Sequence, residues 1–227
     1  MSPRTVIPID KNWEFRQADK EHSKFLPVAQ FPTNVHLDLL HHGLIPDPFI
    51  GKNELDVQWI GEAQWTYKTT FKLEGASVPV EDGSQKAVLA FDGLDTFATV
   101  KLNGTTILET DNMFIPERVD VTSLLQEDNE LVIDFDSAYL RGWKLVEKYP
   151  DHKWGCWNGD NSRLAVRKAQ YHWVSSCLGL QHERPCCRKH CADWLGAYRA
   201  GIGVRLSLPV APGGQSTWRS SRAGWQI

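Results

Sequence analysis

The dipeptide Asn103-Gly104 constrains the fold of this chain more than any other sequence feature. The strand-like runs Phe97–Leu102 and Thr106–Glu109 flank it on either side. A type I′ turn requires positive φ at both central positions, and Asn followed by Gly meets that requirement best. The segment therefore predicts a β-hairpin, which in turn needs further strands and a buried face to be stable.

Other segments supply those strands. Residues Trp65–Leu73 alternate strictly, which places five apolar or small side chains on one face, and Ala87–Phe91 is a continuous apolar run typical of a central strand. We expect further strands at Asn12–Arg16, Val57–Ile60 and Asn129–Phe135, and short helices at Leu37–Gly43 and Tyr139–Tyr149. Between these elements we expect an extended connection around Pro27 and Pro32, a surface loop at Glu74–Lys86 and a turn within Val119–Leu125. Many short strands separated by turn residues predict an all-β sandwich with short helices.

Length and charge narrow the possible partners. The chain has 227 residues, enough for one large domain or one domain plus an appendage, and a formal net charge of −3. This net charge is not the positive charge typical of proteins that bind nucleic acid, and no apolar run is long enough to span a bilayer. We therefore expect neither nucleic acid nor a membrane as a partner. The first residues lack the apolar region of a signal peptide, and the first 155 residues contain no cysteine, which predicts a cytoplasmic location.

The composition changes abruptly after Trp173. Four of the five cysteines follow this residue, together with seven basic and two acidic residues, so residues 174–227 carry +5 while the preceding part carries −8. The tail shows no clean hydrophobic period and is rich in Gly and Pro. We therefore divide the chain into a sandwich domain, residues 1–173, and an unmatched C-terminal tail, residues 174–227, expected to be irregular or disordered.

Several blocks of the first part together resemble one family. They are Ile45–Glu54, Trp65–Tyr67, Phe91–Thr96, Val100–Gly104, Asp111–Phe114, Trp157–Asp160 with Arg163, and Arg167–Trp173. In this order the blocks resemble the N-terminal domain of the glycoside hydrolase family 2 β-mannosidases, in particular the B-like group. The chain would then be a truncated fragment of such an enzyme.

The resemblance implies a galactose-binding-like jelly-roll β-sandwich at the front of a longer retaining glycosidase. Such an enzyme removes terminal non-reducing β-D-mannose from β-D-mannosides with two glutamates that a (β/α) barrel supplies. This chain is too short for the sandwich and a barrel of about 250 residues, so we expect no catalytic residue in it and no glycoside cleavage by it alone. The implied partners are a mannoside substrate in the full-length enzyme and the missing barrel; no cofactor is implied.

The resemblance is lost after Trp173. The family continues with Gly-Trp-Asp-Trp-Gly-Pro, whose Asp contacts substrate hydroxyls, whereas this chain has Val174–Gly179 with Ser176 at the Asp position. A serine lacks the charge-assisted acceptor of a carboxylate. We interpret the tail as the translation of a shifted frame or an intron. Losing the last strand there would leave an unpaired sheet edge.

Tryptophans near this boundary are the candidate sugar contacts. Aromatic faces stack on the C–H faces of sugars, and the resemblance places Trp157 and Trp173, with Trp154 beside them, near the mouth of the active site. The alternative function is a stand-alone carbohydrate-binding module without catalysis, and a third possibility is a non-functional product that folds poorly. A fragment of an enzyme should expose an apolar surface where the barrel docks, which a genuine module should lack.

Other chemistry is less well supported. His182, Cys186, Cys187, His190 and Cys191 are too crowded for the paired ligands of a tetrahedral zinc site. The adjacent His41 and His42 are expected to point apart. Asp134 and Asp136 share one face of their strand and could form a carboxylate pair, although a solvent-facing polar row is the simpler interpretation. We therefore predict no metal site.

Overall fold

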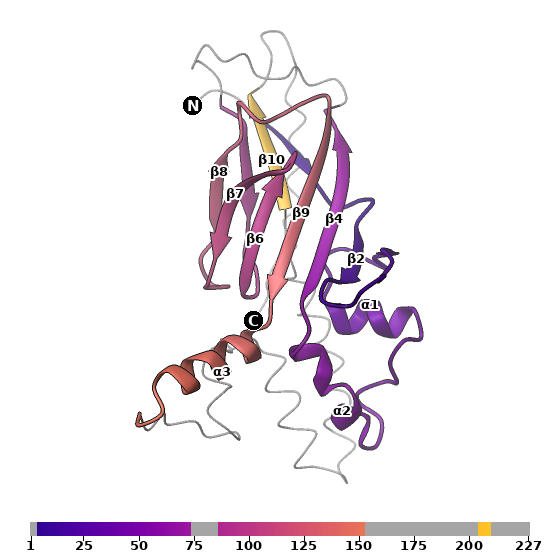
Figure 1. Ribbon diagram of the computed structural model, residues 1–227. Helices are drawn as coiled ribbons and strands as arrows, with labels where there is room; N and C mark the ends of the chain where they lie inside the picture. The colour runs from indigo at the N-terminus through magenta and orange to yellow at the C-terminus, as the bar shows by residue number, and fades with distance from the viewer. Residues whose placement is uncertain (1–3, 74–85, 153–203, 210–227) are drawn as a thin grey trace, which may run out of the picture.

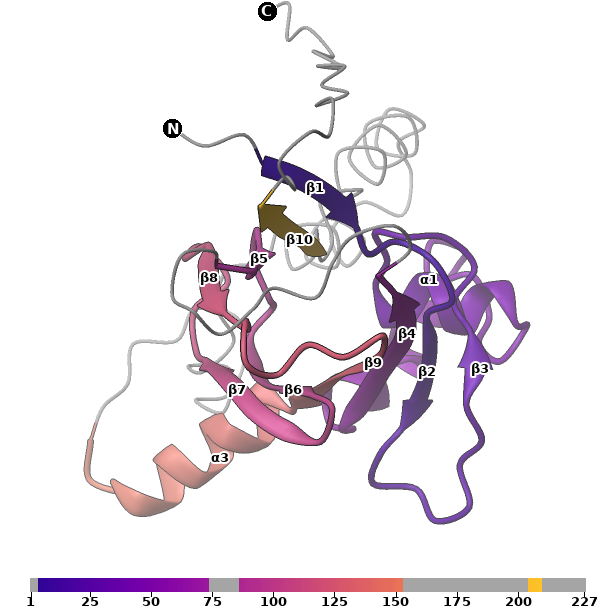
Figure 2. The same cartoon turned by 90° about the horizontal axis from the view of Figure 1, so that it is seen from above.

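The computed structural model describes residues 4–73, 86–152 and 204–209, and these form two antiparallel sheets packed face to face (Figures 1 and 2). The larger sheet has the strand order β3-β2-β4-β9-β6-β7, and the smaller has the order β1-β10-β5-β8. Figure 2 shows the two sheets as opposed layers viewed along the strands. The predicted all-β sandwich is therefore confirmed.

The strands of the six-stranded sheet all fall within residues 14–136, a range that also supplies β5 and β8 of the other sheet. These six strands are β2 (Glu14–Gln17), β3 (Leu26–Pro27), β4 (Trp65–Lys72), β6 (Phe97–Leu102), β7 (Thr105–Thr110) and β9 (Asp128–Asp136). The long central pair β4 and β9 runs in register from Trp65 opposite Phe135 to Lys72 opposite Asp128. The alternation predicted for β4 is confirmed from Tyr67 onward, because Tyr67, Thr69 and Leu73 are buried and Thr70 and Lys72 are exposed; at the start of the strand Trp65 and Thr66 are both buried.

The four-stranded sheet joins segments that are far apart in the sequence. Its strands are β1 (Arg4–Pro8), β5 (Val88–Phe91), β8 (Glu117–Asp120) and β10 (Val204–Pro209). Strand β10 lies between β1 and β5 and pairs with both, so that Leu206 faces Ile7 on one side and Leu89 on the other. The apolar run of β5 is a central strand, as predicted.

A single hydrophobic core fills the space between the sheets. Side chains of both layers contribute to it, and the largest of those with less than 2% exposure are Phe15, Leu89, Phe91, Leu94, Val100, Leu102, Val121, Leu131, Ile133, Leu206, Leu208 and Thr69. Interdigitation of both inner faces at near-crystalline density is the source of stability in a sandwich.

The hairpin β6–β7 is confirmed at Asn103-Gly104. Asn103 has φ 51° and Gly104 φ 81°, the positive values that a type I′ turn requires. The Asn103 side chain also forms hydrogen bonds to residues outside the hairpin: its Nδ2 donates to the Leu124 carbonyl at 2.7 Å, and its Oδ1 accepts from the backbone amide of Glu130 at 2.9 Å. The turn is thereby fixed to β9 as well as to its own strands.

The helices are short and lie beside the sandwich. They are α1 (Val35–His41), α2 (Asn53–Asp56), the 3₁₀ helix η1 (Gln58–Gly61) and α3 (Ala138–Lys148). Both predicted helices exist, although α1 begins two residues earlier than expected because Asn34 caps it, accepting from the Leu37 amide at 3.1 Å. Buried Asp38 accepts a hydrogen bond from the Tyr67 hydroxyl at 2.8 Å and so attaches α1 to β4.

The strand predicted at Val57–Ile60 is wrong. These residues enter η1, and the two buried side chains are Val57 and Ile60, which are three residues apart. Burial at i and i+3 fits a helical turn, whereas a strand would bury alternate residues. A four-residue apolar run leaves the two periods hard to distinguish.

The expectation of an irregular tail is wrong for residues 204–209. This segment is β10, and it alternates in the manner of a half-buried strand: Val204, Leu206 and Leu208 are at most 2% exposed, while Arg205 is exposed. Three alternate apolar residues in a short stretch were too weak a signal beside the charged and Gly-rich surroundings. The sheet edge expected to be left unpaired is therefore covered by β10 in the part of the chain that the structure describes.

Candidate functional site

One end of the sandwich gathers α2, η1 and α3 (lower end in Figure 1). The strand register explains this grouping: β4 starts at Trp65, opposite Phe135 near the end of β9, and Phe135 also pairs with Ala98 near the start of β6. Strand β7 ends at Thr110, opposite Ala98, so the β7–β8 loop reaches the same end. Segments from four parts of the sequence therefore meet there.

Polar contacts hold the two helical segments of this end together. The Ser137 hydroxyl, at the N-cap of α3, donates to the Gly61 carbonyl of η1 at 2.6 Å and accepts from the Leu140 amide at 3.0 Å. Asp136 accepts from Gln64 Nε2 at 2.9 Å and from Arg141 Nε at 2.7 Å. Partial burial opposes the charge of Asp136, but the bonds from Arg141 and Gln64 outweigh it and lower its pKa.

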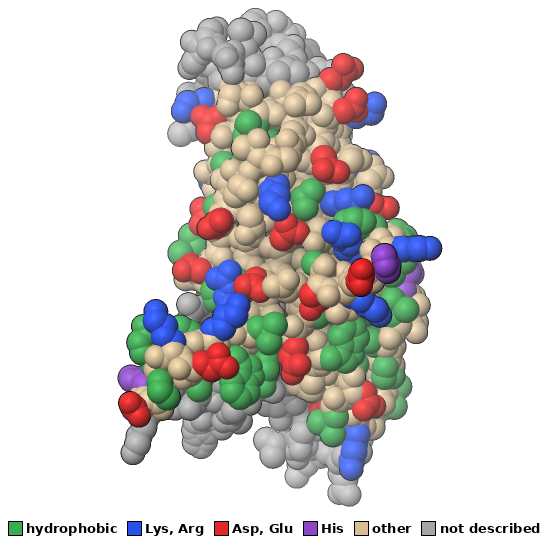
Figure 3. All heavy atoms as spheres, in the orientation of Figure 1, with side chains coloured by type: hydrophobic (Ala, Val, Ile, Leu, Met, Phe, Trp, Pro, Cys, Tyr) green, Lys and Arg blue, Asp and Glu red, His purple; other side chains and the backbone are tan. Residues whose placement is uncertain are grey.

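The same end exposes large apolar side chains. Large apolar side chains around α2, η1, α3 and the β7–β8 loop have between 37 and 67% of their surface exposed, and we call seven of them the apolar end: Ile50, Leu55, Trp59, Phe114, Ile115, Leu140 and Trp143. Figure 3 shows green side chains concentrated over α3 and α2 at this end. Exposed apolar groups that gather in one region are typical of surfaces that bind another protein, a membrane or a ligand.

The carboxylates Asp134 and Asp136 do not form a reactive pair. Asp134 forms an ion pair with Lys101 at 2.9 Å and accepts from the Thr66 hydroxyl at 2.6 Å, while Asp136 is bound to Arg141. Each carboxylate is thus neutralised by its own cation on the outer face of the sheet. This agrees with the polar row predicted from the sequence.

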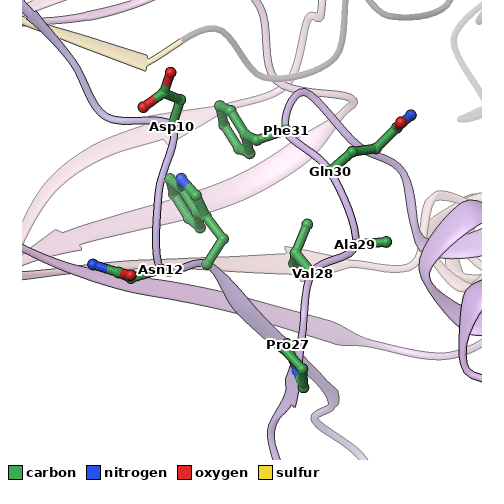
Figure 4. A pocket seen from close by; sticks show the side chains of 8 residues that line it. Asp10, Asn12, Pro27, Val28, Ala29, Gln30 and Phe31 are labelled. Carbon is green, nitrogen blue, oxygen red and sulfur yellow. The ribbon is translucent and has the colours of Figure 1, made fainter.

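A shallow pocket that the sequence did not predict lies beside β2 (Figure 4). Its walls come from the segments Asp10–Trp13 and Pro27–Phe31, and its volume is about 210 Å³. The only signal for it in the sequence is the pair of prolines that predicts an extended connection there. One of the two wall segments precedes β2 and the other begins at the last residue of β3, so only the pairing of β2 with β3 brings them together, which a local pattern does not show.

Metal binding has no support in the described part of the chain. Within residues 4–73, 86–152 and 204–209, no three His, Cys, Asp or Glu side chains come together as metal ligands. His41 and His42, expected to point apart, instead lie edge to face with ring centroids 5.2 Å apart, and His42 Nε2 lies 2.7 Å from the Pro27 carbonyl. No described helix is long and apolar enough to cross a membrane.

The predicted sugar contacts lie outside the described residues. The structure describes no residue between His152 and Val204, and Trp154, Trp157 and Trp173 lie in this segment. The crowded His and Cys residues of the tail lie in it as well.

Known proteins resemble this chain over most of its length. The family model for the glycosyl hydrolase 2 galactose-binding domain-like family matches residues 13–175. Over 174 residues the chain is 78% identical to beta-mannosidase B of Thermothelomyces thermophilus, covering 76% of this chain and 20% of that protein. It is 49% identical over 176 residues to beta-mannosidase B of Neosartorya fischeri, again about 20% of that protein.

The fold is also similar to that of a solved relative. The crystal structure of β-D-mannosidase from Dictyoglomus thermophilum matches 89% of this chain and 22% of its own, with a TM-score of 0.63 and 32% identity. This chain thus spans about a fifth of the length of the relatives it matches. On sequence and on fold, the chain belongs to the glycosyl hydrolase 2 galactose-binding domain-like family.

Proposed function

We propose that this chain serves as the N-terminal, non-catalytic domain of a β-mannosidase that hydrolyses terminal non-reducing β-D-mannose residues with retention. The observation that carries this proposal is the 78% identity with a beta-mannosidase B over 174 residues. Hydrolysis with retention needs two carboxyl groups about 5–5.5 Å apart on either side of the sugar. We assign these two groups to a separate barrel domain. In the described part of the chain, the one candidate carboxylate pair is held by Lys101 and Arg141.

The apolar end is the surface that we assign to contact with that barrel. Trp143 and Trp59, at 43 and 39% exposure, stand on α3 and η1, and the bond from Ser137 to Gly61 fixes these two elements relative to each other. A rigid arrangement of aromatic side chains suits a permanent interface, whose core is rich in aromatic residues. A stand-alone sugar-binding module, the alternative considered above, has no use for such a surface.

Trp157 and Trp173 remain the proposed sugar contacts of the complete enzyme, and a cytoplasmic location stays a prediction. Both tryptophans follow α3 in the sequence, and α3 lies at the apolar end. The proposal thus assigns contact with the barrel to the apolar end and contact with the substrate to these two tryptophans.

A chimera tests this proposal. Residues 13–173 of this chain would replace the matching part of the Thermothelomyces thermophilus beta-mannosidase B, and hydrolysis of p-nitrophenyl β-D-mannopyranoside would be measured. We expect the chimera to hydrolyse the mannoside, because the two sequences are 78% identical over the 174 residues that they share. This chain by itself should show no hydrolysis.

A pair of variants locates the interface. In the chimera, Trp143→Ser should weaken docking and lower the temperature at which activity is lost, whereas Lys144→Ser on the same helix should leave it unchanged. A chimera that folds, as judged by circular dichroism, but does not hydrolyse the mannoside would contradict the proposal. If the two variants lose activity at the same temperature, the apolar end is not part of the interface.

A further inference from the structure

We propose that Asn103, in the turn between β6 and β7, is a site of spontaneous deamidation that the folded hairpin protects, and that its conversion to aspartate or isoaspartate separates the turn from β9. This site lies away from the apolar end (Figure 1). The Asn103 backbone amide donates to the Glu130 carbonyl near the start of β9, whereas the apolar end lies beside Phe135, near the end of that strand. The proposed barrel contact therefore plays no part in it.

The pair Asn103-Gly104 supplies the reacting groups. In deamidation the backbone nitrogen of the following residue attacks the side-chain carbonyl carbon of asparagine, so that a new C–N bond forms as the bond between Cγ and Nδ2 breaks. The proton of the attacking amide leaves with Nδ2 as ammonia, and water then opens the cyclic imide to give aspartate or isoaspartate. Glycine hinders this attack least because it has no Cβ. Gly104 is also exposed, so water reaches the turn.

The folded hairpin holds the Asn103 side-chain amide in three hydrogen bonds. Nδ2 donates to the Leu124 carbonyl at 2.7 Å and to Asn129 Oδ1 at 3.0 Å, and Oδ1 accepts from the backbone amide of Glu130 at 2.9 Å. Attack by the Gly104 nitrogen makes the amide carbon tetrahedral and expels Nδ2, which breaks these bonds. Three hydrogen bonds of ordinary strength correspond to more than about tenfold in an equilibrium constant, so we expect the reaction to start from the opened turn.

Aspartate at this position does not restore the contacts. It has an acceptor oxygen in place of Nδ2, and this oxygen would face the Leu124 carbonyl and Asn129 Oδ1, which are acceptors as well. Asn129 is 2% exposed and cannot turn its amide over to donate, since its Oδ1 accepts from the Gln126 amide at 2.9 Å and its Nδ2 donates to the Gln126 carbonyl at 2.7 Å. Buried acceptors that face one another without a donor destabilise the closed turn.

Isoaspartate, the other product, lengthens the turn itself. Its backbone runs through the former side-chain carbonyl carbon, which adds one atom to the chain before Gly104. Leu102 pairs with Thr105 across two residues with φ 51° and 81°, and a two-residue turn depends on that spacing. Both products therefore release the turn from β9, and the loss of ammonia makes the change permanent. The hairpin thus carries a one-way chemical step whose rate depends on how often the turn opens.

Peptide mapping by mass spectrometry on the 227-residue chain tests this proposal. Samples would be kept in mildly alkaline buffer with and without guanidinium chloride, and conversion of Asn103 would be followed by the change in peptide mass and by detection of isoaspartate. We expect conversion in the native chain to be more than about tenfold slower than in the denatured chain, because the three hydrogen bonds must open first. The peptides must separate this pair from Asn158-Gly159, which lies outside the described residues.

Matched variants show whether the hydrogen bonds give the protection. Asn129→Ala removes one acceptor of the Asn103 amide and should speed conversion in the native chain, while Asn112→Ala, in the β7–β8 loop at the other end of the sandwich, should leave it unchanged. Gly104→Ala should slow conversion in guanidinium chloride, where the geometry of the turn plays no part, because its methyl group hinders the attack.

The effect of the product is measured separately. Asn103→Asp should lower the folding equilibrium constant by more than about tenfold in urea denaturation. Asn112→Asp should lower it far less, because this side chain keeps the oxygen that accepts from the Phe114 amide. This comparison stays decisive if Asn129→Ala unfolds. The proposal is overturned if Asn103 converts at the same rate in the native and denatured chains, or if Asn103→Asp is as stable as the wild type.

Discussion

The two sheets of the sandwich are assembled in different ways. The six-stranded sheet uses only residues 14–136, all within the region that the family model matches. The four-stranded sheet takes β1 from the first residues of the chain and β10 from residues 204–209, both outside the matched region 13–175. One sheet therefore lies wholly within the family-matched region, whereas half the strands of the other come from outside it.

This difference shows that the core does not follow the limits of the sequence resemblance. Leu206 and Leu208 of β10 are fully buried, as are Leu131 and Ile133 of β9 in the opposite sheet. A strand whose alternate residues are apolar can occupy the space between β1 and β5 whatever its origin, because backbone pairing is independent of side-chain identity. The consequences can be tested separately in each sheet.

The largest effect is expected from removing apolar volume in β10. Leu206→Ala should lower the free energy of unfolding by about 2–5 kcal/mol, the usual cost of a fully buried Leu-to-Ala change. Urea denaturation followed by tryptophan fluorescence measures it. Leu131→Ala makes the same change in the six-stranded sheet and should cost a similar amount. If Leu206→Ala has no effect while Leu131→Ala does, the four-stranded sheet does not depend on β10.

A pH dependence should arise beside the six-stranded sheet. Burial lowers the pKa of His36, in α1, from 6.5 to about 4. Between about pH 6.5 and pH 4 the unfolded chain therefore binds a proton that the folded chain does not, so this histidine should make stability fall by about 3 kcal/mol as the pH drops. Urea denaturation of the wild type and His36→Gln over this range measures the effect.

The difference between the stability curves of the wild type and His36→Gln gives the contribution of His36 alone. Burial raises the pKa of Asp38 above 3.8 in the folded protein. Above pH 3.8 the folded chain therefore holds a proton that the unfolded chain releases, so this group makes the protein less stable as the pH rises, which is opposite to the effect of His36. Subtracting the curve of His36→Gln from that of the wild type removes this contribution. His22→Gln, on an exposed side chain, should reproduce the wild-type curve. Identical curves for His36→Gln and the wild type would contradict the assignment.

A smaller effect is expected at the hairpin of the six-stranded sheet. Gly104 has φ 81°, and a Cβ added there would meet no atom within 4 Å, so the cost of Gly104→Ala is confined to the backbone. We expect a loss of roughly 1–2 kcal/mol in unfolding free energy. Gly61→Ala serves as the control, because it has equal space and no positive φ. Equal effects of the two changes would mean that the turn geometry is not the cause.

The smallest effect concerns the ionic contact of β10. Arg205 pairs with Asp92, which also lies 3.6 Å from Arg118, and all three side chains are about half exposed. Arg205→Gln should therefore change the unfolding free energy by less than about 1 kcal/mol, and less still in high salt. A much larger loss would show that β10 is held by charge and not by its buried leucines.

The sequence predicted the elements whose signals are local. Strict alternation located β4, the Asn103-Gly104 pair located the hairpin, and a continuous apolar run located the central strand β5. The errors at Val57–Ile60 and at residues 204–209 have one physical cause: in a short run, tertiary contacts decide between helix, strand and irregular structure. Strand β10 depends on pairing with β1 and β5, which no local pattern encodes.

The candidate site was less predictable than the fold. The expectation of an exposed apolar surface followed from the resemblance, but its residues come from three helical segments and a loop that only the strand register brings together. The pocket beside β2 depends on two loops held by bonds between Val28 and Trp13 and between Ala29 and Asp38. The tryptophans named from the sequence, Trp157 and Trp173, stay predictions.

Hydrogen exchange at residues 204–208 tests the central claim, that a strand from beyond the family-matched region completes the sandwich. Mass spectrometry on the native chain would compare these amides with those of β5, its neighbour in the sheet. Because β10 lies between two strands, its amides should exchange as slowly as those of β5. Exchange at the rate of an unfolded peptide would show that the four-stranded sheet forms without β10 and would contradict the account.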